Sequence, residues 1–362
     1  MSSIKPTFGQ KLKLGLFNKY VKTQTGLHEL SYLFWECTLR CNINCLHCGS
    51  DCHRDSAIHD MPYPDFIAIA KKVAKVYNPN KTMIVLTGGE PLVRKDIEAC
   101  GYELYKLGFP WGLVSNGYIF TKERFKTLLG AGLRSVTISL DGFSESHNWL
   151  RGRDDSWEKA VKAIKLIVKE NDPVYDVVTC VNQKNFKELE NLRDFLIEEG
   201  VKKWRLFTIF PIGRAAENPL LDISYKQFRW LMEFISNTRK NNKIEISYGC
   251  EGFLGSYENK VRNGFYFCRA GINIASVLAD GSISACPNIN RAFVQGNIYK
   301  DDFIEVWNNK FEVMRNRQWT KTGICKSCDV YKYCKGNGIH LHEPENENVL
   351  RCHFNMLQEA CS

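Results

Sequence analysis

Residues 35–52 read WECTLRCNINCLHCGSDC, and three cysteines in this stretch decide how the chain is interpreted. Cys41, Cys45 and Cys48 follow the spacing Cx3Cx2C directly after a short β-rich run. Thiolates so close in sequence can converge on one metal centre, and three of them leave one iron of a [4Fe–4S] cube without a protein ligand. An iron with an open position can bind a cofactor or substrate directly. The stretch therefore predicts a redox centre.

A zinc site is the alternative for the same stretch. Structural zinc usually has four Cys or His ligands, so a fourth ligand would be needed. The neighbouring candidates are Cys37, Cys52, His47 and His53. The motifs that follow along the chain favour the iron–sulfur interpretation.

The composition is ordinary for a globular chain of 362 residues, with 44% hydrophobic and 25% charged residues and a net charge of +9. We find neither an apolar run near the roughly 18 residues that span a bilayer nor the apolar segment of a signal peptide, so we expect a cytoplasmic protein. In that compartment fifteen cysteines indicate metal binding or catalysis, not disulfides. Cys100, Cys180 and Cys361 stand apart and are expected to be ordinary thiols.

Residues 1–30 form a basic extension, which contains five lysines and one acidic residue, Glu29. The lysines are Lys5, Lys11, Lys13, Lys19 and Lys22, and apolar residues such as Leu12, Leu16 and Phe17 are interleaved with them. We expect a solvated helix here. Weak contact with a membrane surface or an acidic partner is the alternative.

From residue 31 to about 210, β-rich runs alternate with helical patterns. The expected strands are 31–37, 82–88, 110–116, 134–140, 174–180 and 203–210. The expected helices lie near 63–77, 95–107, 121–131, 156–170 and 186–199. Such alternation indicates parallel βαβ crossovers, and six units predict an α/β fold, a partial (β/α)6 barrel. Active residues then lie at the C-terminal ends of the strands.

After about residue 215 the alternation is expected to stop. A helical pattern fits 224–240, and short strand-like runs follow, with seven cysteines in addition to Cys361. We therefore expect three segments: the basic extension 1–30, the partial barrel 31–215, and a helical linker with a metal-stapled extension at 216–362.

Turn-like motifs follow the expected strands. The second strand ends in Gly88-Gly89-Glu90-Pro91, where glycines let a ligand approach the backbone closely. The third ends in Ser115-Asn116-Gly117, and the fourth carries Ser139 and Asp141, with Arg151 twelve residues after the serine. The sixth runs into FPIGRA, with Phe210 and Ile212.

These motifs, in this order, resemble the radical S-adenosylmethionine (SAM) superfamily. The resemblance implies that Cys41, Cys45 and Cys48 hold a [4Fe–4S] cluster whose open iron binds the amino and carboxylate groups of SAM. One electron then cleaves SAM to a 5′-deoxyadenosyl radical, which abstracts hydrogen from a substrate. The residues implied in SAM binding are Gly88, Gly89, Glu90, Ser115, Asn116, Ser139, Asp141, Arg151 and Ile212. Glu90 belongs to the segment near the amino group, Ser139 lies near the ribose and Arg151 near the carboxylate, while Phe210 or Ile212 packs on the adenine.

The C-terminal cysteines resemble the SPASM extension, which carries up to two auxiliary iron–sulfur clusters. The family frame reads Cx9–15Gx4C, then Cx2Cx5Cx3C, then C, and six of its seven cysteines are present. By this resemblance an outer cluster uses Cys325, Cys328, Cys334 and Cys352. An inner cluster uses Cys250, Cys268, Cys286 and a cysteine at 338, where this chain has Gly338. The inner site is then open, ligated by His340 or His342, or degenerate; a zinc ribbon remains the alternative for the outer frame.

SPASM relatives often modify peptides or proteins, so we expect maturation of a peptide or small protein under anaerobic conditions, with an electron donor such as flavodoxin or ferredoxin. Pro287 stands where sulfatase-maturing members carry an acid, which argues against that activity. The stretch around Cys41 is also similar to anaerobic maturases associated with small lipoprotein-like targets. About 30 residues precede the first strand, too few for a fused leader-peptide-binding domain.

Two other functions remain open at this stage. One is a radical SAM enzyme acting on a small molecule, such as a tetrapyrrole or an aminoglycoside. The other is a zinc-stapled binding protein, for which we find no recognised nucleic-acid motif.

Overall fold

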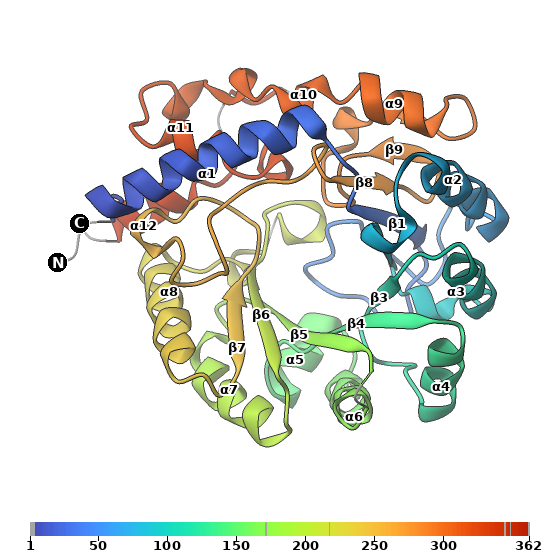
Figure 1. The fold of residues 1–362 in the computed structure, drawn as a ribbon. Helices are drawn as coiled ribbons and strands as arrows, with labels where there is room; N and C mark the ends of the chain where they lie inside the picture. The colour runs from blue at the N-terminus through green and yellow to red at the C-terminus, as the bar shows by residue number, and fades with distance from the viewer. Residues whose placement is uncertain (1–3, 171, 217, 344, 348, 361–362) are drawn as a thin grey trace.

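A single ten-stranded sheet, ordered β10-β9-β8-β1-β2-β3-β4-β5-β6-β7, organises the computed structural model of this chain (Figure 1). The structure describes residues 4–170, 172–216, 218–343, 345–347 and 349–360. The strands are β1 (Tyr32–Thr38), β2 (Met83–Gly88), β3 (Trp111–Ser115), β4 (Leu133–Ser139), β5 (Val174–Val181), β6 (Lys203–Thr208), β7 (Glu245–Tyr248), β8 (Ile274–Val277), β9 (Ser282–Ser284) and β10 (Gly296–Asn297). Strands β8 and β1 to β7 pair with one another in parallel, and β9 is antiparallel to both β8 and β10.

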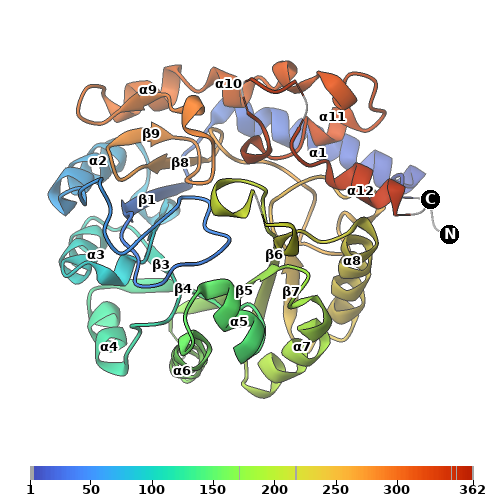
Figure 2. The same cartoon turned by 180° about the vertical axis from the view of Figure 1, so that it is seen from behind.

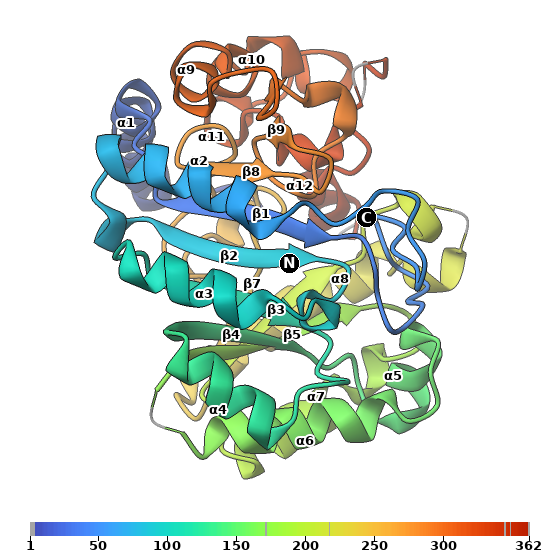
Figure 3. The ribbon, with the colours of Figure 1, turned by 90° about the vertical axis from the view of Figure 1, so that its right-hand side faces the viewer.

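Helices cover the outer face of the curved sheet. They are α2 (Tyr63–Val76), α3 (Ile97–Lys106), α4 (Lys122–Gly130), α5 (Ser144–Arg151), α6 (Ser156–Val168), α7 (Leu189–Glu198) and α8 (Tyr225–Lys240). The C-terminal region adds α9 (Phe303–Asn309), α10 (Glu312–Arg315), α11 (Tyr331–Cys334) and α12 (His353–Glu359). Figure 1 shows this region above β8 and β9, while Figure 3 shows the parallel strands running in one direction.

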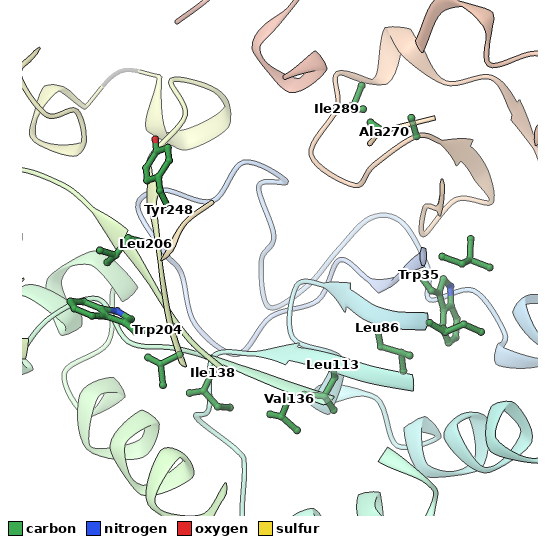
Figure 4. Close-up of a cluster of buried hydrophobic side chains, with 14 of the residues drawn as sticks. Trp35, Leu86, Leu113, Val136, Ile138, Trp204, Leu206, Tyr248, Ala270 and Ile289 are labelled. Carbon is green, nitrogen blue, oxygen red and sulfur yellow. The ribbon is translucent and has the colours of Figure 1, made fainter. Parts of the chain in front are cut away.

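The core lies between the sheet and the outer helices. Val136, Ile138, Trp204 and Leu206 are buried on the helix side, as Figure 4 shows. Their alternating neighbours on β4 and β6, among them Ser139, are half-buried on the opposite face, which we call the inner face. Since successive strand residues point to opposite faces, the sheet packs on one side and remains partly open on the other.

The predicted α/β fold with a partial barrel is confirmed. All six expected strands and the helices expected between them are present within a few residues of their predicted bounds. The sheet does not close, since β7 and β10 are its two ends.

The expectation that the alternation stops near residue 215 is wrong. Helix α8 begins with a capping box made by Ser224 and Gln227, and it leads into β7, which pairs in parallel with β6. The four residues of β7 are too few to form a recognisable period. Because one sheet crosses this boundary, the division into 1–30, 31–215 and 216–362 stays a proposal.

The basic extension forms α1 (Phe8–Leu27), which confirms the expected helix. Its Leu14 is buried, and the ring of Phe17 lies 5.4 Å from that of Phe265. Figure 3 shows α1 at the end of the sheet where the strands begin. Within the described part of the chain, we find no helix with the length and apolar character that crossing a membrane requires.

Candidate functional site

The loop after β1 carries the three cysteines and lies across the C-terminal ends of the strands (Figure 2). The amide of Cys41 donates to the carbonyl of His53 at 2.8 Å, and Arg40 pairs with Asp60. These contacts close residues 40–60 into a compact loop, which we call the cysteine loop.

The glycines that end β2 allow this loop to lie against the sheet. The amide of Gly89 donates to the carbonyl of Thr38 at 2.8 Å. A Cβ on Gly88 would lie 2.1 Å from that carbonyl oxygen, and a Cβ on Gly89 would lie 2.2 Å from the carbonyl oxygen of Arg40. Gly88 also has a φ of +124°, a conformation that favours glycine. The two glycines therefore fit the close approach of the cysteine loop.

Each of the three thiols has a polar donor beside it. Asn116 Nδ2 lies 3.8 Å from Cys41 Sγ, and Arg151 Nη1 lies 3.7 Å from Cys45 Sγ. The amide of Cys52 donates to Cys48 Sγ at 3.3 Å. Donors directed at cysteine sulfurs tune iron–sulfur clusters, so this donor set fits such a group.

The thiols differ in their acidity. A side-chain hydrogen bond with Cys52, helped by the Cys52 amide and Arg214, lowers the pKa of Cys48 to about 5. Burial raises the pKa of Cys41 to about 12. Cys48 is therefore a thiolate at neutral pH, the form that binds metal.

The candidates for a fourth ligand differ in their surroundings. Cys37 Sγ donates to the carbonyl of Thr87 at 3.3 Å and packs in the main core. Cys52 lies beside Cys48, and His53 pairs with Asp51 at 3.0 Å. Among the described residues, no three His, Cys, Asp or Glu side chains are grouped as ligands of a single metal ion.

Glu90 joins the ends of β2 and β3. Its carboxylate is fully buried and accepts hydrogen bonds from Ser115 Oγ at 3.0 Å and from the amide of Asn116 at 2.8 Å. A third comes from the amide of Leu92 at 3.1 Å. Burial outweighs these bonds and raises the pKa of Glu90 to about 7. Glu90 thus positions Asn116, which in turn reaches Cys41.

Arg151 and Asp141 form a buried ion pair at the end of β4. Arg151 Nε and Nη2 lie 2.6 Å and 2.5 Å from Asp141 Oδ2. Burial alone would raise the pKa of Asp141, but the charge of Arg151, the nearby His47 and His147 and the amide of Cys180 together outweigh it and hold the pKa below its usual value. Arg151 is the last residue of α5, and the carbonyl of Leu150 accepts from the amide of Leu46 at 2.8 Å. The end of α5 is therefore fixed to the cysteine loop.

The structure separates the two residues expected at the adenine. Ile212 lies against Gly49, with its Cδ1 3.8 Å from the position of a Gly49 Cβ. The ring of Phe210 instead lies 4.3 Å from that of His340, in the C-terminal region. Ser139 is half-buried on the inner face, at the end of β4. Of the two, Ile212 lies nearer the cysteine loop.

The outer cysteine frame surrounds one cavity. Cys325, Cys328, Cys334 and Cys352 all line a cavity of about 210 Å³. Asn337 adds its amide, which donates to Cys334 Sγ at 3.2 Å. Four thiols around one cavity fit a fully ligated cluster.

The inner frame consists of Cys250, Cys268 and Cys286, and these thiols are near enough to interact by charge. Burial, with smaller contributions from Cys250 and Cys268, raises the pKa of Cys286 to about 12. Glu251 fixes the turn at Cys250, because its carboxylate accepts from the amide of Thr208 at 2.7 Å and lies 3.1 Å from His353 Nε2.

Several functional contacts had no signal in the sequence. Arg214, in the segment after β6, donates to the carbonyl of Cys52 at 2.7 Å and so holds the cysteine loop. On the inner face, Thr137 Oγ1 donates to Asp176 Oδ1 at 2.6 Å, and Arg205 Nη2 lies 2.8 Å from Asp176 Oδ2. Only their position on neighbouring strands links these residues.

Of the isolated cysteines, Cys100 is buried in the core, Cys180 lies near Asp141, and Cys361 lies outside the described residues.

Comparisons with known proteins agree with this geometry. The model of the radical SAM superfamily matches residues 35–196, and that of the SPASM iron–sulfur cluster-binding domain matches residues 268–329. An AdoMet-dependent heme synthase of Methanosarcina barkeri is 26% identical over 83% of this chain and 89% of its own length. The mycofactocin maturase MftC of Mycobacterium tuberculosis is 25% identical over 90% of this chain and 84% of its own.

Solved structures share the fold. SuiB of Streptococcus suis bound to SAM has a TM-score of 0.71 at 18% identity, covering 91% of this chain and 77% of that one. The structure of anSMEcpe with bound AdoMet has a TM-score of 0.70 at 19% identity, covering 91% and 95%. SAM and iron–sulfur clusters are accordingly the cofactors of this chain. The chain is an enzyme and belongs to the SPASM-containing subgroup of the radical SAM superfamily.

Proposed function

We propose that this enzyme modifies a peptide or small protein, with SAM bound at the cysteine loop. When bound, the cluster and SAM supply a radical that abstracts hydrogen from the substrate. Cys41, Cys45 and Cys48 would ligate the SAM-binding cluster. The maturase MftC, similar over 90% of this chain, supports a peptide substrate.

The surrounding residues would position SAM. Gly88 and Gly89 let the cysteine loop lie against the end of β2, and Asn116 is held against Cys41 through Glu90. Ser139 lies at the end of β4 and Ile212 lies in the segment after β6, and they would contact the ribose and the adenine. Arg151 would reach the carboxylate with the nitrogen that faces Cys45.

The observation that carries the peptide proposal is that four arginines on the inner face and in the segments after the strands each have an acidic partner. These pairs are Arg151 with Asp141, Arg205 with Asp176, Arg214 with Asp51, and Arg291 with Asp280. A ligand with several carboxylates needs cations that are available to it. Paired charges instead suit a substrate that is close to neutral and offers amide donors and acceptors, as a peptide does.

The test is anaerobic incubation of the loaded enzyme with SAM, a reductant such as reduced flavodoxin or ferredoxin, and candidate peptides encoded beside its gene. We expect 5′-deoxyadenosine to form in proportion to the modified peptide. The mass of that peptide should decrease by about two hydrogens, as the formation of one crosslink requires. Turnover of a tetrapyrrole, with every peptide unchanged, would contradict the proposal.

A small-molecule substrate remains the second candidate. The observation in its favour is the AdoMet-dependent heme synthase, 26% identical over 83% of this chain. Parallel incubation with an iron tetrapyrrole, followed by its absorption spectrum, separates the two candidates.

We also propose that α1 contacts an anionic membrane surface. Its exposed apolar side chains are Phe8, Leu12, Leu16, Tyr20 and Leu27, which we call the α1 stripe. Most are four residues apart, so they share one side of the helix, away from the side that packs through Leu14 and Phe17. The helix has four lysines and no acidic residue. An apolar stripe with flanking lysines is the pattern of an interfacial helix.

Sedimentation with vesicles tests this contact. Wild type is expected to bind vesicles containing phosphatidylserine and to release them at high salt, because the lysines contribute by charge. Leu12→Ser/Leu16→Ser should abolish binding, whereas Val76→Ser, at an exposed position of α2, should not. Failure of wild type to bind, or unchanged binding of the double variant, would contradict the proposal and point to a protein partner.

A further inference from the structure

The position of the missing cysteine is occupied by a histidine ring. Gly338 has ordinary backbone angles, φ −71° and ψ 142°, so the main chain itself would accept a cysteine. A Cβ on Gly338, however, would lie 2.3 Å from Cε1 of His340 and 2.6 Å from its Nδ1. Real Cβ atoms do not approach other atoms so closely. The imidazole of His340 therefore fills the space in which the side chain of a cysteine at position 338 would begin.

This ring lies beside the turn formed by Cys250 and Glu251. The same Cβ position is 3.1 Å from the carbonyl oxygen of Glu251, and the amide of Gly338 donates to that oxygen at 3.3 Å. Glu251 directly follows Cys250, the first cysteine of the inner frame. Phe210 covers the ring from the barrel side, with 4.3 Å between ring centroids. His340 is thus held next to the turn that carries Cys250.

The hydrogen-bonding state of the two nearby histidines differs. His340 Nε2 is buried and has no hydrogen-bond partner among the described residues. His342 Nε2 lies 2.5 Å from the carbonyl oxygen of Gly336 and is already engaged. A buried nitrogen without a partner is costly, and coordination to a metal is one way to satisfy it.

We propose that His340 Nε2 is the fourth protein ligand of the inner auxiliary cluster, with Cys250, Cys268 and Cys286 as the other three. Imidazole in place of thiolate keeps the site closed and raises the reduction potential of the cluster. The proposal concerns the SPASM cluster and is independent of the substrate, so it can fail while the proposed peptide activity stands, and the reverse.

The first test is pulsed EPR on the reduced, fully loaded enzyme without SAM, labelled with 15N-histidine. A 15N coupling to an iron–sulfur cluster is expected in wild type and in the matched control His342→Ala, and it should be lost in His340→Ala. Iron content should approach about twelve atoms per wild-type chain, as three [4Fe–4S] clusters require. No coupling in wild type, coupling retained in His340→Ala, or about eight iron atoms per wild-type chain would each overturn the proposal.

A second variant keeps the proposal testable if His340→Ala folds poorly. Gly338→Cys/His340→Ala removes the clashing ring and places a thiol at the family position. It should retain the iron of the inner cluster, lack the 15N coupling, and show an inner-cluster potential lower than that of wild type. An unchanged potential, or a coupling that persists, would show that His340 is not a ligand.

Discussion

The guanidinium of Arg151 connects an acid and a thiol, since it pairs with Asp141 and places Nη1 3.7 Å from Cys45 Sγ. Both members of the ion pair are buried. Arg151 therefore has a structural role, in addition to the role in SAM binding that we propose for it.

Arg151→Ala should leave the buried charge of Asp141 without its partner. Removing one member of a buried pair costs about 3–5 kcal/mol of unfolding free energy. SAM affinity should also fall, by roughly 10–150-fold, if the arginine contacts the carboxylate. Urea unfolding and titration calorimetry measure the two effects.

Arg153→Ala is the matched control, because the Arg153 side chain is 47% exposed and its ion pair is with the similarly exposed Asp155. Water screens such a pair, so this variant should leave the unfolding free energy nearly unchanged. Equal losses in the two variants would contradict the role assigned to the buried pair.

Glu90 should make stability depend on pH near neutrality. Its pKa is raised to about 7, so between pH 4.5 and pH 7 the folded chain binds a proton that the unfolded chain has released. The resulting stabilisation is complete below pH 4.5 and is lost as pH rises through 7. Glu90→Gln should therefore reduce the fall in unfolding free energy between about pH 5 and pH 7, measured anaerobically by urea unfolding. An identical pH slope in the variant and wild type would refute this assignment.

Gly89→Ala should displace the cysteine loop, because its Cβ would meet the carbonyl oxygen of Arg40 at 2.2 Å. We expect loss of about four iron atoms per chain, with the auxiliary clusters retained. Gly15→Ala on α1 is the control, since no atom lies within 4 Å of its Cβ position. There the added methyl should stabilise the helix by about 0.5–1 kcal/mol. Full iron content in Gly89→Ala would contradict the proposed fit between loop and strand.

The alternation of strands and helices could be predicted because each strand buries one face against helices, which leaves a period of two in the sequence. Helix α5 was missed, since its eight residues, SESHNWLR, are mostly polar and depend on contact with the cysteine loop. Cysteine spacing likewise allowed both cysteine frames to be predicted, because the proposed ligands of each cluster are partly contiguous in the sequence.

Contacts between segments that are distant in the sequence produce no such pattern and could not be predicted. Arg214 reaches Cys52 across 162 positions, and Asp176 meets Thr137 only through strand pairing. The sequence alone shows that position 338 lacks the cysteine of the family frame. The position of the His340 ring in its place depends on packing against Phe210 and the Glu251 turn, which the sequence does not show.

The central claim is that Cys41, Cys45 and Cys48 hold the cluster that cleaves SAM. The direct measurement is reductive formation of 5′-deoxyadenosine by the anaerobically reconstituted variant Cys41→Ala/Cys45→Ala/Cys48→Ala, with iron content determined on the same sample and Cys100→Ala as control. The account predicts no 5′-deoxyadenosine from the triple variant, a loss of about four iron atoms relative to wild type, and normal activity of the control. Undiminished SAM cleavage by the triple variant would contradict it.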